Sequence, residues 1–430
     1  MAYLEQFRLI TFIILFSLAI VYAYQLGYII LSFIYRKVKP LPETDQRNRF
    51  AIMISARNEE GVIGELLDSL RKQNYPKDKY DIYVVADNCT DHTGDVAEKG
   101  GAKVYRRFNT EQVGKGYALH FLYQEIVSVK GNDYYDGYVV FDADNIVDPN
   151  FLFEMNKKWA TGKYDALTTY RNSKNFGTNW LTAAYSIWFM HEARHMNYVR
   201  DMIGAQCMIS GTGFVVSKKV MQENNGWPFY FLVEDIQFSV SSTISGYRIG
   251  YCDSAILYDE QPFTMKQSWN QRLRWAKGFY QIDGRYIGDL CKGVAFEKGR
   301  RLAFYDVLMT CLPCSLLTVG MLAMAIWILC TSMFMPYYIQ LIFRQEMVEF
   351  ILFMLANTCL GTIALAGITV FSEWKRIPAK TSDKIKYIFT FPMYILTYLP
   401  ITVQALFAKV TWKPIKHYST AELALEENRK

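Results

Sequence analysis

The stretch Tyr138-Val139-Val140-Phe141-Asp142-Ala143-Asp144 is an apolar run that ends in two acidic residues. A short run of this composition is typical of a buried strand. Residues two apart on an extended chain share a face, so Asp142 and Asp144 would present their carboxylates together. Paired carboxylates at a strand end can hold a divalent cation against a diphosphate, because hard cations prefer oxygen ligands. We therefore predict a strand that delivers a phosphate-binding and metal-binding pair.

The sequence around this stretch alternates short apolar runs with segments of helical spacing, which is the pattern of a nucleotide-binding α/β domain. Polar residues follow three of the runs, at Ser55-Ala56-Arg57, at Asp87 and at Asp142. Because substrates of open α/β sheets bind beyond the carboxyl ends of the strands, we expect these ends to converge on one crevice. The expected strands are Phe50–Ser55, Ile82–Ala86, Lys103–Tyr105 and Tyr138–Phe141, and the expected helices are Glu60–Gln73, Asp91–Lys99 and Tyr117–Val129.

Two later clusters add the chemistry of group transfer. Val233-Glu234-Asp235 opens a segment of helical spacing, where a carboxylate can serve as a general base. In Gln271-Arg272-Leu273-Arg274-Trp275, the residues Gln271, Arg274 and Trp275 have the spacing of one helix face. Such a face can hold a departing diphosphate and stack a sugar ring. Together with the acidic strand end, the clusters indicate a sugar-nucleotide site.

Further short motifs occur between these clusters: Ala56-Arg57-Asn58-Glu59-Glu60, Ala86-Asp87-Asn88-Cys89-Thr90-Asp91 and Gly114-Lys115-Gly116. With these motifs in this order, the chain resembles the processive family 2 glycosyltransferases, the membrane synthases of cellulose, chitin, hyaluronan and related β-linked polysaccharides. The resemblance runs from about Phe50 to Trp275 and is greatest to bacterial exopolysaccharide synthases. It implies an α/β GT-A type (Rossmann-like) cytoplasmic catalytic domain combined with α-helical transmembrane segments.

The resemblance also implies a role for each motif. Asp87 would bind the uracil or ribose of the donor, and Lys115 would contact the nucleotide. Asp144 would be the principal ligand of Mg²⁺ or Mn²⁺, with Asp142 nearer the nucleotide. Asp235 would take the proton from the acceptor hydroxyl, in a single displacement that gives a β-linked product. The predicted set is catalytic Asp235 and Glu234, substrate-binding Ala56, Arg57, Glu59, Asp87, Lys115, Asp142, Gln271, Arg274 and Trp275, and metal-binding Asp144 and Asp142.

Each of these positions also has a structural alternative. Asp87 and Asp144 could cap the helix or loop that follows, and Lys115 could be a solvated lysine in a glycine turn. The Glu-Asp pair would be favoured by a helix dipole, and Val233 stands where the family usually has Thr. The aromatic and basic residues around Trp275 would also suit a helix that merely anchors to a membrane surface.

Four uncharged apolar runs flank a mixed central sequence, and each is long enough to cross a bilayer at about 1.5 Å per residue. The first run is too long for a signal-peptide core, so we interpret it as a retained anchor. The basic residues between Arg36 and Arg49 place the central domain in the cytoplasm by the positive-inside rule. The runs are Leu9–Tyr35, Val307–Phe334, Phe350–Phe371 and Tyr387–Ala408.

The topology of the last apolar run is ambiguous. A full crossing would put the lysines after it outside, against the charge rule, whereas Pro392 and Pro400 could kink or break the helix. We therefore favour a re-entrant or interfacial segment and a cytoplasmic tail. The loop Pro336–Met347 is expected outside and the loop Glu373–Lys386 inside.

Two further segments have a weaker likeness to the family. Ser210-Gly211-Thr212-Gly213 occupies the place of a small-residue segment along the acceptor path. Phe407–Trp412 and Lys416-His417 resemble the gating segments that close over bound UDP. Because such short runs are common in turns and tails, the simpler interpretation of His417 is an exposed tail residue.

Composition excludes some classes of function. The net charge of +6 is explained by the membrane flanks and the need to hold a diphosphate, so it gives no independent support for nucleic-acid binding. Among the eight cysteines, Cys311 and Cys314 lie in an apolar run with no His or acid to complete a metal set. We expect neither disulfides nor zinc.

These observations predict a processive, inverting β-glycosyltransferase that polymerises UDP-glucose or UDP-N-acetylglucosamine and exports the product. Its partners would be the UDP-sugar, the growing polysaccharide, membrane lipids, and a second copy or accessory subunit that completes the pore. We expect a multi-pass protein of a bacterial plasma membrane. The alternatives are a non-processive transferase onto a polyprenyl-phosphate carrier and a silent scaffold or transporter, which the intact acid set disfavours. The predicted domains are 1–40 (anchor), 41–262 (catalytic), 263–303 (interfacial helices), 304–408 (membrane segments) and 409–430 (tail).

Overall fold

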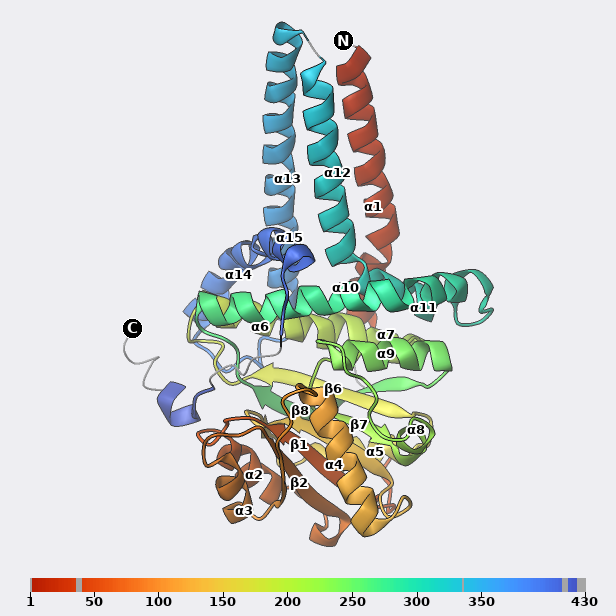
Figure 1. The fold of residues 1–430 in the computed structure, drawn as a ribbon, viewed down its shortest axis with the longest axis vertical. Helices are drawn as coiled ribbons and strands as arrows, with labels where there is room; N and C mark the ends of the chain where they lie inside the picture. The colour runs from red at the N-terminus through yellow and green to blue at the C-terminus, as the bar shows by residue number, and fades with distance from the viewer. Residues whose placement is uncertain (1, 36–40, 335, 412–416, 424–430) are drawn as a thin grey trace.

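A computed structural model of the chain describes residues 2–35, 41–334, 336–411 and 417–423. Several charged residues on which the predicted orientation depends lie outside the described residues, namely Arg36, Lys37, Lys39, Lys413 and Lys416, as does Trp412 of the predicted gating segment. In the described chain, a sheet with helices on both faces is followed by a layer of helices and then by a group of upright helices (Figure 1).

The sheet forms the centre of the region between residues 50 and 259. Its strands are β1 (Phe50–Ala56), β2 (Tyr80–Asp87), β3 (Lys103–Arg107), β4 (Gly137–Asp142), β5 (Ile146–Val147), β6 (Ala166–Ser173), β7 (Phe214–Ser217) and β8 (Ile249–Asp259). Their order within the described residues is β3-β2-β1-β4-β7-β6-β8-β5. The first four run parallel, β7 is antiparallel to β4 and β6, β6 and β8 are parallel, and β5 is antiparallel to β8.

Both faces of the sheet are buried under helices. The helices of this region are α2 (Ile63–Arg71), α3 (Thr93–Lys99), α4 (Lys115–Lys130), α5 (Phe151–Trp159), α6 (Trp180–His191), α7 (Tyr198–Ile203) and α8 (Lys218–Glu223), with a π-helix, η2 (Glu192–Asn197), between α6 and α7 and a short 3-10 helix, η1 (Lys77–Lys79). Along β1, Ile52 and Ile54 pack with α2, whereas Ala51 and Met53 pack with α4. This alternation follows from the two-residue period of a strand, and burial on both sides explains why β1 is apolar from Phe50 to Ile54.

The elements predicted for the central sequence are confirmed. β1 to β4 and the helices between them lie within a few residues of the predicted runs. In the sheet register Ser55 pairs with Asp142 and Ala56 pairs with Ala86. The polar residues that follow β1, β2 and β4 therefore emerge side by side at one edge of the sheet.

A layer of helices crosses the molecule between the sheet and the upright helices (Figure 1). It contains α9 (Glu234–Ser245), α10 (Met265–Phe296) and α11 (Arg301–Cys311). A capping box of Thr264 and Gln267 begins α10. Gly278 lets α10 approach the start of α9, because a Cβ at this position would lie 2.6 Å from the Val233 side chain. The close approach brings the Glu-Asp pair against the helix that carries Gln271.

Three upright helices project from this layer: α1 (Ala2–Ile34), α12 (Pro313–Met333) and α13 (Tyr337–Ser372) (Figure 1). The predicted run Val307–Phe334 is not one span, since α11 ends at Cys311 and Pro313 begins α12. Proline suits a helix start but not a helix interior. Val307 is buried in a core with residues of α9 and α10, and its neighbour Asp306 forms a buried ion pair with Arg200 at 2.7 Å. The run therefore contributes to the upright helices only from Pro313 onward.

The other predicted membrane segments also differ in part from the structure. Pro336 is the N-cap of α13, so the segment expected as the loop Pro336–Met347 is helical from Tyr337. The last run forms two helices, α14 (Thr381–Leu396) and α15 (Tyr398–Phe407), at the foot of the upright helices (Figure 1). α14 packs against α6 and α13, and α15 packs against α10. Within the described residues, Tyr337–Ser372 and Thr381–Phe407 are long and apolar enough to cross a membrane. In their most apolar parts the first is 6% buried and the second 39% buried, so the second makes more contact with the rest of the protein.

Candidate active site

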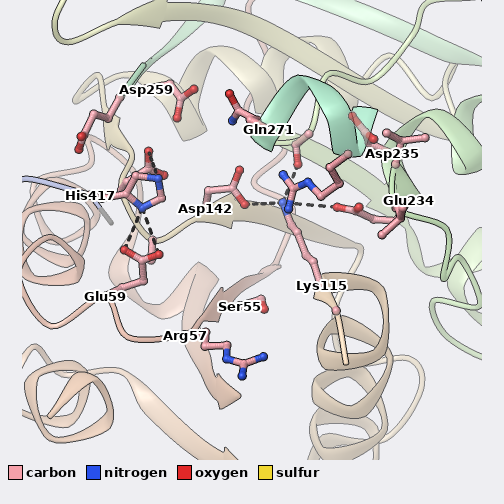
Figure 2. A pocket seen from close by; sticks show the side chains of 18 of the residues that line it. Ser55, Arg57, Glu59, Lys115, Asp142, Glu234, Asp235, Asp259, Gln271 and His417 are labelled. Carbon is pink, nitrogen blue, oxygen red and sulfur yellow. Dashed lines mark hydrogen bonds and ion pairs between the residues drawn. The ribbon is translucent and has the colours of Figure 1, made fainter. Parts of the chain in front are cut away.

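A cleft opens beyond the carboxyl ends of β1, β2 and β4 and is bounded on its other side by the starts of α9 and α10 (Figure 2). The structure brings almost all of the predicted site residues to this cleft: Arg57, Glu59, Asp87, Lys115, Asp142, Asp144, Glu234, Asp235, Gln271, Arg274 and Trp275. Ala56 is the exception, because its side chain is buried in the core beneath the sheet edge. Its predicted contact with substrate could therefore come only from its backbone, whereas the neighbouring Arg57 and Glu59 line the cleft with their side chains.

Asp87 lies at the end of β2, where an ion pair fixes its carboxylate. Oδ1 of Asp87 accepts a hydrogen bond from Nη1 of Arg107 at 2.6 Å, and both side chains are buried. The helix-cap alternative is wrong for this residue. The first turn of α3 is instead served by Asp91, whose Oδ1 accepts the backbone N–H of Thr93 at 3.0 Å.

Lys115 bridges the two sides of the cleft. Its ammonium forms an ion pair with Asp142, donates to the carbonyl of Gly211 at 2.8 Å and lies 3.8 Å from the carboxylate of Glu234 (Figure 2). Burial alone would lower the pKa of Lys115, but the charges of Asp142 and Glu234 raise it overall. Lys115 is thus a partly buried cation held by carboxylates, and the alternative of a solvated turn lysine is wrong.

Asp144 and Glu59 meet the C-terminal segment in the cleft. Nδ1 of His417 lies 3.0 Å from Oε2 of Glu59, and its Nε2 lies 3.9 Å from Oδ2 of Asp144 (Figure 2). The interpretation of His417 as an exposed tail residue is therefore wrong, because the side chain lines the cleft. Burial alone would lower the pKa of His417, but Asp144 and Glu59 raise it well above its ordinary value.

The cleft has an excess of acidic side chains over basic ones. The pKa of Glu260 is raised to about 8, chiefly by burial. The charge of Asp144 also raises this pKa, whereas the nearby His417 lowers it. An additional cation would relieve this excess. Within the described residues, no group of three or more His, Cys, Asp and Glu side chains is arranged to hold a metal ion. Asp144 and Asp142 nevertheless supply two carboxylates, the ligand type that hard cations prefer, and a cation held by them would need substrate phosphate and water to complete its shell.

Glu234 and Asp235 occupy the first turn of α9 and differ in their partners. Glu234 faces Lys115, whereas the carboxylate of Asp235 forms no ion pair with any described residue. Burial raises the pKa of Glu234 and of Asp235. The structure therefore leaves Asp235 as the less constrained carboxylate of the pair, with a proton affinity above that of an ordinary aspartate.

Gln271, Arg274 and Trp275 lie on one face of α10, as their spacing predicts, and this face lines the cleft. Within the described residues, Oε1 of Gln271 and Nε of Arg274 are buried without a hydrogen-bond partner. Buried polar atoms are normally bonded, so these two groups are free to form hydrogen bonds with a ligand in the cleft. The Trp275 ring meets Tyr185 edge-on at 5.7 Å between centroids, which fixes its orientation. Membrane anchoring alone does not account for this face.

Some cleft residues were not predicted from the sequence. Arg171 donates from Nε to Asp259 at 2.9 Å and from Nη1 to the Ser210 carbonyl at 2.8 Å, and both charged residues line the cleft. Asp259 closes the alternating strand β8, so the rule used for Asp87 and Asp142 could have found it. Arg171 carries no such signal because it lies within β6. Gly211 lines the cleft, as expected for the small-residue segment at this place.

The family model "Glycosyltransferase like family 2" matches residues 47–278 of the chain. Among curated proteins, the "Probable glycosyltransferase YdaM" of Bacillus subtilis (strain 168) is 27% identical over 318 residues, which cover 67% of this chain and 72% of that protein. A beta-monoglucosyldiacylglycerol synthase of Synechocystis sp. is 26% identical over 64% of this chain and 57% of its own length. A poly-beta-1,6-N-acetyl-D-glucosamine synthase of Staphylococcus aureus (strain MSSA476) is 25% identical over 57% of this chain and 58% of its own length. The match thus spans little more than half of these two synthases.

A solved structure supports the same fold. The mannosyltransferase PcManGT from Pyrobaculum calidifontis, in complex with GDP-Man and Mn²⁺, superposes with a TM-score of 0.52 at 17% identity, over 90% of this chain and 96% of that chain. The mixed sheet of the present chain is accordingly a GT-A type glycosyltransferase fold. The family model covers more than half of the chain, including the strands and helices that bound the cleft. The chain therefore belongs to the glycosyltransferase like family 2 and is a glycosyltransferase.

Proposed function

We propose that the chain is an inverting, processive β-glycosyltransferase that transfers a hexose from a UDP-sugar to the end of a growing β-linked polysaccharide. One observation carries this proposal. The carboxylate Asp235, the ring of Trp275 and the acidic strand end Asp142 to Asp144 line the same cleft. A base, a stacking surface for an acceptor and a site for a diphosphate are the parts that such a transfer needs.

The donor would lie along the ends of β1, β2 and β4. Arg57, Asp87 and Lys115 would bind its nucleotide, and Gln271 and Arg274 would take up the diphosphate from the opposite side. Support for this orientation comes from the unpartnered Nε of Arg274, since a guanidinium donates to phosphate oxygens, and the amide nitrogen of Gln271 could donate in the same way.

The reaction would be a single displacement. Asp235 accepts the proton of an acceptor hydroxyl as the hydroxyl oxygen bonds to the anomeric carbon, and the bond from that carbon to the diphosphate oxygen breaks with its electron pair leaving on UDP. The configuration inverts, so an α-linked donor gives a β-linked product. The raised pKa of Asp235 supports this role, because a base with higher proton affinity takes the proton more readily.

A divalent cation, Mg²⁺ or Mn²⁺, would be held by Asp144 and Asp142 and would neutralise the charge that develops on the leaving diphosphate. The ammonium of Lys115, which forms an ion pair with Asp142, would also help to neutralise the charge on the leaving diphosphate. The relative with known structure was solved with Mn²⁺, and its fold is shared by this chain.

The acceptor would approach from the side of α10 and stack on Trp275. Tyr185 and Phe189 of α6 hold the indole with centroid distances of 5.7 and 6.2 Å, so the ring is fixed before a sugar arrives. The helices α10, α14 and α15 lie between the sheet and the upright helices, which supports delivery of the product toward a membrane (Figure 1). We further propose that this is a multi-pass membrane protein whose catalytic domain faces the cytoplasm.

A second candidate is transfer of a single sugar to a lipid, such as a diacylglycerol or a polyprenyl phosphate. It is favoured by the similarity to the beta-monoglucosyldiacylglycerol synthase of Synechocystis sp.. The position of α15 beside α10 would also allow a lipid head group to enter from the membrane surface. This candidate shares the donor half of the site and differs in what lies against Trp275.

The test is UDP release and product analysis with the purified full chain in detergent. UDP-glucose and UDP-N-acetylglucosamine are supplied separately with Mg²⁺ or Mn²⁺, with and without diacylglycerol or polyprenyl phosphate. A long product that linkage-specific β-glycanases digest, formed without added lipid acceptor, supports the polymerase. Lipid-dependent release that yields only a glycolipid supports the second candidate instead, and no turnover of either UDP-sugar contradicts both.

A further inference from the structure

We propose that Arg107, which does not line the cleft, is a positioning residue that sets the nucleobase preference of the donor site through Asp87. The inference rests on the proposed UDP-sugar donor. It concerns how this chain would distinguish uracil from cytosine and how base binding would be linked to diphosphate binding.

The two residues are neighbours in the sheet. Arg107 ends β3 and pairs with Asp87 at the end of β2. The Arg107 side chain is 7% exposed and the Asp87 side chain 5% exposed, and Nη1 of Arg107 lies 2.6 Å from Oδ1 of Asp87. Asp87 lines the cleft and Arg107 stands behind it. The guanidinium therefore holds one carboxylate oxygen, which fixes the direction of the other.

A carboxylate that is held as an anion can only accept hydrogen bonds. Uracil carries an N–H at ring position 3 and can donate to such an acceptor. Cytosine has a lone pair at the same ring position, so an anionic oxygen there is repelled. A fixed, ionised Asp87 would thus favour UDP over CDP, whereas an Asp87 free to rotate could turn toward the exocyclic amine of cytosine.

The same guanidinium also holds the segment that leads to Lys115. Nη2 of Arg107 donates to the carbonyl of Gln112 at 2.9 Å. Asn88, which has a left-handed backbone at φ 53°, supports this segment, because its side chain exchanges hydrogen bonds with the backbone of Asn109 at 2.8 and 3.0 Å. Two residues after Gln112 the chain turns at Gly114 and delivers Lys115 to the cleft. Arg107 therefore touches both the residue for the base and the loop for the diphosphate.

The ion pair of Arg107 and Asp87 could have a purely structural role, so the test needs a control that separates folding from base recognition. The chain offers a matched control in Arg106, the adjacent residue of β3. Its guanidinium projects to the outside, is 41% exposed, and pairs with Asp95 at 2.7 Å and Glu98 at 2.5 Å. Arg106→Gln and Arg107→Gln therefore make the same chemical change on the same strand, and only the second touches Asp87.

The experiment is calorimetric titration of the purified full chain with UDP and with CDP, each with Mn²⁺, in the wild type, Arg106→Gln, Arg107→Gln, Asp87→Asn and the double variant of Asp87 and Arg107. We expect Arg107→Gln to lower the UDP-to-CDP affinity ratio by about tenfold or more, since a charge-assisted hydrogen bond to the base is lost. Arg106→Gln should keep the wild-type ratio. The UDP-to-CDP affinity ratio of the double variant should be close to that of Asp87→Asn alone, because both substitutions remove the same contact between Asp87 and the base.

The outcomes separate this inference from the proposed function. A wild type that prefers UDP, together with an Arg107→Gln variant that keeps this preference, overturns the inference alone. A wild type that binds CDP as tightly as UDP overturns the inference together with the uracil donor. Should Arg107→Gln fail to fold, Arg107→Lys provides the test, because it keeps the charge but loses the planar fork that joins Asp87 to Gln112. Its ratio should then fall below that of the wild type, and an unchanged ratio overturns the inference.

Discussion

The two walls of the cleft are prepared for a ligand in different ways. The strand-end wall, formed by Glu59, Asp87, Lys115, Asp142 and Asp144, is occupied by its own ion pairs. On the helix wall, formed by Asp235, Gln271, Arg274 and Trp275, buried polar atoms of Gln271 and Arg274 have no partner within the described residues. A donor would therefore have to rearrange contacts on the first wall and would complete them on the second.

This difference indicates how affinity and chemistry are divided. Paired charges keep the strand-end wall ordered without a ligand, at the cost of competition when the diphosphate and its cation arrive. Unpaired buried groups cost stability until they are bonded, so the helix wall gains most from the ligand. We expect the contribution of the strand-end wall to activity to depend chiefly on a bound cation. We expect the contribution of the helix wall to depend chiefly on its own side chains, so that substitution there weakens ligand binding.

The largest expected effect concerns the cation at the strand-end wall. Removal of divalent metal with EDTA should lower the rate of sugar transfer by about 100-fold or more, because several kcal/mol of charge stabilisation on the leaving group are lost. Activity should return with Mg²⁺ or Mn²⁺, and Asp144→Asn should raise the metal concentration needed for half-maximal UDP release. Full turnover in EDTA would show that Lys115 and Arg274 stabilise the leaving diphosphate without a cation. It would contradict the proposed dependence of the strand-end wall on metal.

The next effect concerns Arg274 of the helix wall, whose Nε has no hydrogen-bond partner within the described residues. Arg274→Ala should weaken UDP binding by about 10- to 100-fold, the range expected for lost hydrogen bonds to a charged ligand. Arg285→Ala is the control on the same helix, because that side chain is 63% exposed and lies outside the cleft. Titration calorimetry with UDP and Mn²⁺ measures both variants. Equal affinity in the two would contradict a diphosphate contact at Arg274.

A smaller effect should separate acceptor binding from donor binding on the same wall. Trp275→Ala should reduce polymer formation by about tenfold while sparing the slow release of UDP to water, because an aromatic face adds on the order of 1 kcal/mol to stacking beyond its buried area. Trp275→Phe, which keeps a ring, should recover much of the loss. Parallel loss of polymer and of UDP hydrolysis in Trp275→Ala would instead make the indole part of the donor site.

The smallest effect is on stability and follows from the raised pKa of Asp235. A carboxyl group with a higher pKa in the folded state stabilises the fold below its unfolded pKa, and this contribution is lost as the pH rises through the folded pKa. The ionised group therefore disfavours the folded state at neutral pH. Asp235→Asn should raise Tm by about 2 °C at pH 8, and the gain should vanish toward pH 4. An unchanged Tm at pH 8 would contradict the burial of this charge.

Much of the sheet and of both walls could be predicted from local patterns. Apolar runs with polar ends located β1, β2 and β4, and the spacing within Gln271 to Trp275 put three side chains on one face. Both patterns are local, because each can be recognised from a few consecutive residues. The roles of the site residues came from the family resemblance, since a strand-end aspartate alone could equally have been a cap.

The rest depends on contacts between distant segments. Arg107 and Arg171 meet their partners through the sheet register, which no local pattern reports. His417 reaches Glu59 across nearly the whole length of the chain. The start of the run at Val307 is apolar enough for a membrane, yet it packs against α10 in a core. The sequence could not distinguish the two, because a buried core and a bilayer both favour apolar residues.

The central claim is that Asp235 is the base of a sugar transfer for which the strand-end wall holds the nucleotide. The direct measurement compares wild type and Asp235→Asn for UDP binding and for UDP release from the preferred UDP-sugar with acceptor and Mn²⁺. We predict that UDP affinity stays within about twofold, because Asp235 is not assigned to the nucleotide, while transfer falls by about 1,000-fold, within the range known for loss of a general base. Transfer that survives in Asp235→Asn would contradict the account and would move the reaction away from this carboxylate.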